Sequence, residues 1–190
     1  MRLPFIVSLN SLMHDRSKDS TSTLYDYADT ELYDYTDADF TGTVVRENRH
    51  STSEYILMLS NEAISWSLKC QSTVSTFSTK AKYIGQFNAA QEAVWICLFL
   101  EKLDFRNLIQ KPTILYTDSD EAWALSQDPT LHSKIKHMKI KYYWQHQQIE
   151  HEILHFNDIL SKDNITNSLT KSLSKQEFKK FRMQLNLSNS

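Results

Sequence analysis

Two acidic motifs in this 190-residue sequence follow runs of residues that are typical of β-strands. Asp37 ends a first expected strand over 32–37, and Asp118 follows a second over 113–117, each with another aspartate two residues later. If these strands lie in one sheet, their carboxylates converge, and carboxylates with water and phosphate oxygens are what Mg²⁺ prefers. Two such ions, about 3.5–4 Å apart, catalyse phosphodiester cleavage. Spacing alone favours surface aspartates that cap turns.

The elements that must position these residues follow from the apolar periodicity. Strands are expected over 32–37, 54–60, 63–68, 113–117 and 153–156, and the pair Asn61-Glu62 fits a tight hairpin turn. Helices are expected over 79–103 after an N-cap at Ser78, and over 120–126, 133–149, 163–173 and 175–185. Three leading strands followed by alternating elements predict a mixed sheet with helices packed on it. The periodicity leaves open whether 153–156 is an edge or a central strand. Six apolar positions are expected in the core: Ile64, Trp66, Ile84, Trp95, Leu115 and Phe156.

Composition excludes several classes of protein. The sequence has only two glycines, so it lacks the glycine-rich turns of P-loop and dinucleotide-binding folds, and some turns must use less suitable residues. Its two cysteines form no CxxC motif, which excludes a zinc site of that type, and both are expected to be buried. The longest apolar run, eight residues over 93–100, is too short to span a bilayer. The first residues are a poor secretory signal, so the sequence predicts an intracellular protein, cytoplasmic or nuclear rather than secreted.

The charge is uneven along the chain. Residues 131–190 contain 10 Lys and Arg against 5 Asp and Glu, although the whole chain has a formal net charge of −2. A basic segment of this kind either attracts the phosphates of nucleic acid or forms an ordinary solvated helix face, and both interpretations stay open. The nucleic-acid-binding candidates within it are Lys134, Lys136, His137 and Lys141.

Seven sequence blocks together resemble one known family. They are Tyr35–Gly42, His50–Tyr55, Ile64–Val74, Ser78–Tyr83, Tyr116–Pro129, His132–His137 and Asn167–Lys171. In this order they resemble the ribonuclease H domain at the C-terminal end of the Pol polyprotein of copia-type LTR retrotransposons, over about residues 30–185. The resemblance implies an α/β (α+β) fold of the ribonuclease H-like type: a mixed five-stranded sheet, β-β-β-α-β-α-β-α along the chain, with helices on both faces. It also implies a loosely structured lead-in over 1–30, a remnant of the upstream polymerase region, before a domain over 31–187.

The resemblance also implies a chemistry and a defect in it. The family binds two Mg²⁺ ions with four acidic residues and cuts the RNA strand of RNA–DNA hybrids. Asp37 and Asp118 match two of these acids, whereas Lys82 and Asn167 stand at the other two positions. Lys82 reverses the charge of a metal ligand, and Mg²⁺ tolerates few ligand defects. We therefore expect doubtful Mg²⁺ binding, with at most a residual site at Asp37 and Asp118, and an impaired or inactive ribonuclease H.

Three functional interpretations follow from this combination. An active enzyme would need other acids, such as Asp120 or Glu121, to compensate for the lost ligands. A non-catalytic nucleic-acid-binding remnant would need only the fold and the basic face, with an RNA–DNA hybrid or another nucleic acid as its partner. A translated genomic relic would need neither. The sequence predicts no membrane partner and does not indicate the oligomeric state.

Overall fold

The computed structural model describes residues 31–39, 51–72, 78–105, 109, 111–119, 139–171 and 173–186. Five strands are present: β1 (Leu32–Asp39), β2 (Thr52–Leu59), β3 (Glu62–Cys70), β4 (Thr113–Thr117) and β5 (Leu154–Asp158). The helices are α2 (Ser78–Lys102), α4 (Lys139–Glu150), α5 (Asn167–Thr170) and α6 (Lys175–Gln184).

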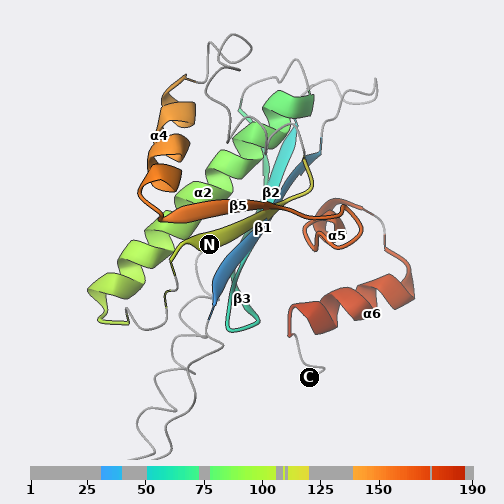
Figure 1. The fold of residues 1–190 in the computed structure, drawn as a ribbon. Helices are drawn as coiled ribbons and strands as arrows, with labels where there is room; N and C mark the ends of the chain where they lie inside the picture. Colours follow the sequence, from blue (N-terminus) through green and yellow to red (C-terminus); the bar gives the residue numbers. More distant parts are fainter. Residues whose placement is uncertain are drawn as a thin grey trace, which may run out of the picture.

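The strands form one mixed sheet in the order β3-β2-β1-β4-β5 (Figure 1). β1 pairs antiparallel with β2 and parallel with β4, and β4 pairs parallel with β5. β5 therefore lies at an edge, which resolves the alternative that the periodicity left open. The predicted mixed five-stranded sheet is confirmed.

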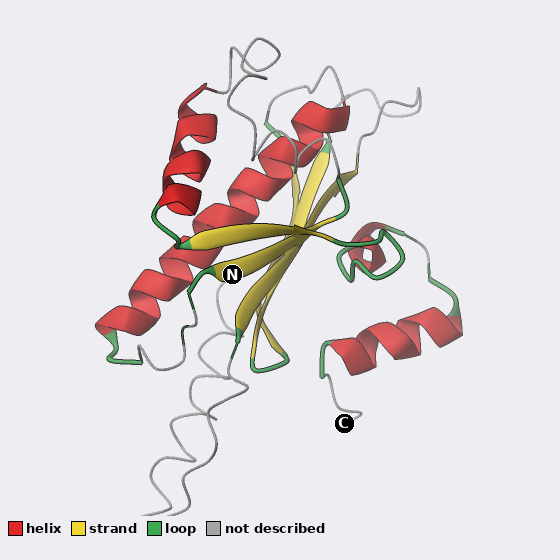
Figure 2. Ribbon diagram, viewed as in Figure 1, coloured by secondary structure: helices red, strands yellow, loops and turns green. Residues whose placement is uncertain are grey.

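Helices cover both faces of the sheet, as expected. Figure 2 shows α2 and α4 on one side and α5 and α6 on the other. The larger core lies under α2 and includes Leu57, Leu115 and Phe156, which are all at most 1% exposed. The smaller core joins Ile56 and Met58 of β2 to residues at the C-terminal end, including Phe181. β2 thus alternates its side chains between two buried layers, because successive residues of a strand point to opposite faces.

Glycine is important at one position of α2. A methyl group at Gly85 would lie 2.8 Å from the carbonyl oxygen of Asp37 and 3.2 Å from the Cβ of Ala38. The helix backbone therefore approaches β1 more closely than any other residue would allow. Because Lys82 lies one turn earlier in α2, the same close approach brings its side chain to the end of β1.

The turns bear out the expected use of residues other than glycine. Five described residues adopt a positive φ and none of them is glycine: Ser60, Asn61, Asp104, Glu152 and Asn186. Ser60 and Asn61 make the hairpin turn between β2 and β3, one residue earlier than the predicted Asn61-Glu62. A two-residue hairpin loop with both residues at positive φ matches the right-handed twist of its strands.

Several sequence-based expectations were wrong in detail. Trp66 and Trp95 are not core residues, since they are 50% and 39% exposed, and Cys70 is exposed whereas Cys97 is buried. Their apolar character suggested burial, but each lies on the outward side of its element. The helix expected over 163–173 is only the short α5, because turns at 161–163 and 165–166 precede it. Ser78 is the first residue of α2 rather than a cap preceding it. The helix expected over 120–126 and the start of that over 133–149 lie outside the described residues.

Among the described residues, no helix is long and apolar enough to cross a bilayer.

Candidate active site

The two aspartates predicted from the motifs are brought together at the ends of β1 and β4. These strands are parallel neighbours, and their register pairs Thr36 with Thr117. Asp37 and Asp118 each follow this pair, so they lie side by side at the same end of the sheet. Both carboxylates are largely buried, with side-chain exposures of 11% and 4%.

Lys82 lies between the two carboxylates, as its match to an acidic ligand position predicts. Its Nζ atom is 3.5 Å from Oδ1 of Asp37 and 3.4 Å from Oδ1 of Asp118, to which it donates a hydrogen bond. The Lys82 side chain keeps an exposure of 28%, so the cluster is open to solvent on one side. We call these three residues the Asp–Lys–Asp cluster. Its arrangement is that of a tethered cation shared by two anions.

The ionisation of the cluster follows from burial and from mutual attraction. Burial and the neighbouring charge of Asp118 raise the pKa of Asp37. Burial alone would raise the pKa of Asp118, but a hydrogen bond from Ser161 and the charge of Lys82 more than offset it and lower that pKa. Burial alone would lower the pKa of Lys82, but Asp37 and Asp118 more than offset it and raise that pKa. The ammonium form of Lys82 is therefore stabilised by the fold.

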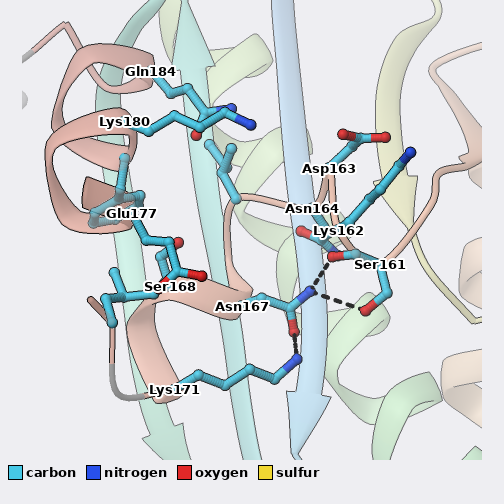
Figure 3. Close-up of a pocket in the computed structure, with 13 residues that line it drawn as sticks. Ser161, Lys162, Asp163, Asn164, Asn167, Ser168, Lys171, Glu177, Lys180 and Gln184 are labelled. Atoms are coloured by element: carbon cyan, nitrogen blue, oxygen red, sulfur yellow. Dashed lines mark hydrogen bonds between the residues drawn. The ribbon is translucent and has the colours of Figure 1, made fainter. Parts of the chain in front are cut away.

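Asn167 reaches the cluster through Ser161. Its Nδ2 atom donates to the carbonyl oxygen of Ser161 at 2.7 Å and to the Ser161 hydroxyl at 3.3 Å (Figure 3). Ser161 in turn hydrogen-bonds Asp118. The Oδ1 atom of Asn167 accepts a hydrogen bond from Lys171. Both the nitrogen and the oxygen of the amide thus form hydrogen bonds within the protein, and the nitrogen rather than the oxygen points toward Ser161.

The segment before α5 is fixed to the first strand by a second amide. Asn164 donates from Nδ2 to the carbonyl oxygen of Thr36 at 3.1 Å, and its Oδ1 accepts from the Thr166 hydroxyl at 2.7 Å. Sequence reasoning missed both Asn164 and Ser161, because neither carries a charge that would mark it. It also missed Gly85, although a glycine inside a helix, in a sequence with only two glycines, was a usable signal.

The basic segment is only partly placed by the structure. Lys134, Lys136 and His137 lie outside the described residues, as do Asp120 and Glu121, the proposed compensating acids. Lys141 is described, and its ammonium lies 4.7 Å from the centre of the Phe87 ring. Burial lowers the pKa of Lys141. This lysine packs between α4 and α2, a position well explained by a cation–π contact.

The Asp–Lys–Asp cluster does not fit Mg²⁺. An ammonium already lies within 3.5 Å of both carboxylates, and like charges at about 4 Å repel by about 4 kcal/mol at intermediate dielectric. Throughout the described ranges, no group of three or more His, Cys, Asp or Glu side chains is arranged to hold a metal ion. The single Lys82 ammonium offsets one of the two negative charges through ion pairs with both carboxylates, which leaves a formal charge of −1.

The raised pKa of Lys82 leads to a prediction about alkaline stability. A cation whose folded pKa is raised stabilises the fold fully below its unfolded pKa of about 10.4, and this contribution disappears as pH rises through the folded value. We therefore expect the stability difference between the unaltered protein and Lys82→Met to be largest near pH 7 and to shrink above pH ~10.4. Urea unfolding of both proteins from neutral to alkaline pH measures this difference. Burial raises the pKa of Tyr35 to about 12. Because both proteins contain this tyrosine, its titration does not contribute to the difference in stability between them. A difference that stays constant with pH would contradict the ion-pair assignment.

Sequence comparisons find relatives among transposon polyproteins. The chain is 34% identical over 151 residues to the retrovirus-related Pol polyprotein from transposon TNT 1-94 of Nicotiana tabacum, covering 80% of this chain and 11% of that protein. It is 35% identical over 150 residues to the Pol polyprotein from transposon RE1 of Arabidopsis thaliana, covering 79% of this chain and 10% of that protein. The chain therefore spans about a tenth of the length of these relatives. No family model matches the chain.

Comparisons with solved structures give more distant similarities. LC11-RNase H1, isolated from compost by a metagenomic approach, is 16% identical with a TM-score of 0.48, over 74% of this chain and 92% of that chain. The same protein in complex with an RNA/DNA hybrid is 17% identical with a TM-score of 0.45, over 70% of this chain and 88% of that chain.

Proposed function

Because this chain belongs to the family of the retrovirus-related Pol polyproteins of copia-type transposons, we propose that its ribonuclease H-like domain no longer cleaves the RNA strand of RNA–DNA hybrids. The observation that carries this proposal is the position of the Lys82 ammonium between Asp37 and Asp118. Two-metal hydrolysis needs both cations to be held while the scissile phosphate bridges them. Here one tethered cation already forms ion pairs with both acids that would bind them.

The hydrogen bonds of Asn167 support the same conclusion. An amide has no negative charge, and this amide gives its nitrogen to Ser161 and its oxygen to Lys171. A divalent ion at this position would have to displace Lys171 and would still lack a carboxylate. Lys82, at one of the family's four acidic positions, thus contacts the acids at two others, and Lys171 contacts the amide at the fourth. Without cation binding, the site can neither activate water nor stabilise a leaving oxygen.

A cleavage assay tests the proposal directly. The purified full chain is incubated with an end-labelled RNA–DNA hybrid in Mg²⁺ and, separately, in Mn²⁺, and the RNA fragments are resolved on a gel. We expect no cleavage above that of an Asp118→Asn variant purified in parallel. This variant is the matched control, because a contaminating ribonuclease would cleave equally in both preparations. Mg²⁺-dependent cleavage that the Asp118→Asn substitution abolishes would overturn the proposal.

A further inference from the structure

The outer strand β3 presents apolar side chains at an open edge. β3 lies at one end of the sheet, and within the described part of the chain no strand pairs with its outer side. Trp66 and Leu68 are 50% and 53% exposed. They pair in register with Ile56 and Glu54 of β2, so both point to the face that carries α5 and α6. An open edge strand with exposed apolar residues is a template for pairing with another strand.

We propose that β3 is a dimer interface through which two copies of this chain pair their β3 strands antiparallel. The pairing of β2 with β3 is irregular between Leu57 and Met58, which leaves Ser65–Cys70 as the regular part of β3. Directly opposite residues in an antiparallel pair point to the same face. In a continuous sheet, one residue must therefore face its own copy, and the two-fold axis passes midway between these two copies. With Ser67 on the axis, Trp66 of each copy lies opposite Leu68 of the other. Four exposed apolar side chains then form one cluster.

The opposite face of β3 favours a second copy over an unrelated partner. Ser65 and Lys69 lie on the face that carries α2, and the Ser65 hydroxyl donates a hydrogen bond to Glu92 of α2 at 3.0 Å. In the same register, Lys69 of each copy lies opposite Ser65 of the other and therefore beside its Glu92. Lys69 is exposed and forms no ion pair with any residue that the structure describes. The two-fold symmetry repeats this charge complementarity twice.

The interface is small, so the dimer is expected to depend on concentration. Five residues from each copy, Ser65–Lys69, are paired, and contacts of this size belong with interfaces that bury less than about 1,200 Å² and are transient. Sedimentation velocity over a wide range of protein concentration should show a monomer at low concentration and a dimer at high concentration. A chain that stays monomeric at every concentration would overturn the proposal.

Substitutions on the two faces of β3 test the register. Trp66→Lys is expected to weaken dimerisation by at least tenfold, whereas Leu98→Lys, at a 51% exposed leucine of α2, is the matched control and should leave it unchanged. Lys69→Glu alone should weaken the dimer, and adding Glu92→Lys in the same chain should restore it, because the charges then attract across the axis again. Equal effects of Trp66→Lys and Leu98→Lys, or no restoration by Glu92→Lys, would overturn the assignment. Circular dichroism and the Tm of each variant separate a lost interface from a lost fold.

A disulfide crosslink provides an independent readout. Ser67→Cys is made together with Cys70→Ser, which leaves the buried Cys97 as the only other cysteine of the sequence. A residue on the two-fold axis faces its own copy, so mild oxidation should give a covalent dimer within the soluble, folded protein. The same change at the control site on α2, Leu98→Cys with Cys70→Ser, should give no such dimer. Equal crosslinking at both sites would contradict the proposed axis.

Discussion

The double substitution Lys82→Glu with Asn167→Asp is expected to give the protein a thermal stability that depends on divalent cations. It restores carboxylates at the two positions that match acidic residues of the family, next to the existing pair Asp37 and Asp118. Without a cation, four carboxylates in a largely buried site repel one another, so the Tm should lie below that of the unaltered protein. A bound ion then stabilises the fold by about 2.7 kcal/mol when it is present at about 100 times its Kd.

Differential scanning fluorimetry with Mg²⁺, Mn²⁺ or EDTA measures this effect. The unaltered protein should have the same Tm in all three, since the Lys82 ammonium already pairs with both carboxylates of its cluster. Each single substitution should respond less than the double variant, because both residues act on one coupled site. Lys82→Gln with Asn167→Asp is the matched control, since it removes the ammonium and adds the carboxylate at position 167 but places no carboxylate at position 82. A Tm of the unaltered protein that rises with Mg²⁺ as much as that of the double variant would refute the assignment of Lys82 as a substitute cation.

Gly85→Val is expected to cause the largest loss of stability among substitutions near the cluster. Its first side-chain carbon would lie 2.8 Å from the carbonyl oxygen of Asp37. That atom belongs to the backbone of a central strand, so it cannot rotate away, and α2 must move instead. Overpacking of a core costs about 1–3 kcal/mol, and we expect the upper end of this range or more for a β-branched residue. Movement of α2 would also separate Lys82 from its two partners.

Urea unfolding of the Gly85 variants tests this prediction. The sign of the stability change caused by Gly85→Ala shows whether the close approach of α2 to β1 requires glycine. Gly85→Ala would stabilise an unstrained helix by up to about 1 kcal/mol, because alanine has the higher helix propensity. Here we expect it to destabilise the protein, with Gly85→Val destabilising it more. Gln91→Val, at an exposed position of the same helix, is the control for the β-branched side chain itself. Stabilisation by Gly85→Ala would mean that α2 is free to move away from β1.

Much of the fold was predictable because its periodicity is local and strong. The pattern predicted β4 at its observed bounds and the other strands to within two residues at each end, and α2 to within one residue. The position of α5 was not predictable in the same way, because its segment is held by Asn164 and Thr36, residues far apart in sequence. The exposure of Trp66 and Trp95 was also hidden, since a large apolar side chain does not reveal which face of its element meets solvent.

The candidate site was predictable in its acids and its cation but not in its supporting contacts. The match to the family's motifs placed Asp37, Asp118 and Lys82 in one cluster, and the structure brings these side chains together. The role of Ser161, which bridges Asp118 and Asn167, depends on the path of the chain after β5. A serine in a turn gives no sequence signal of that kind. The loss of metal binding and of RNA cleavage at these acids stays a prediction, which the cleavage and Tm measurements described above test.

The place of β1 in the sheet has a consequence for how the chain folds. Its antiparallel neighbour β2 follows within a short stretch of sequence, but its parallel neighbour β4 begins at residue 113, and Asn164 contacts Thr36 across 128 positions. The meander β1–β2–β3 can therefore form early, with one side of its first strand unpaired until the second half of the chain arrives. Contacts this distant make folding slow, because the long loop must close before they form. During synthesis on a ribosome, the nascent chain would expose that unpaired side to chaperones or to other chains until β4 emerges.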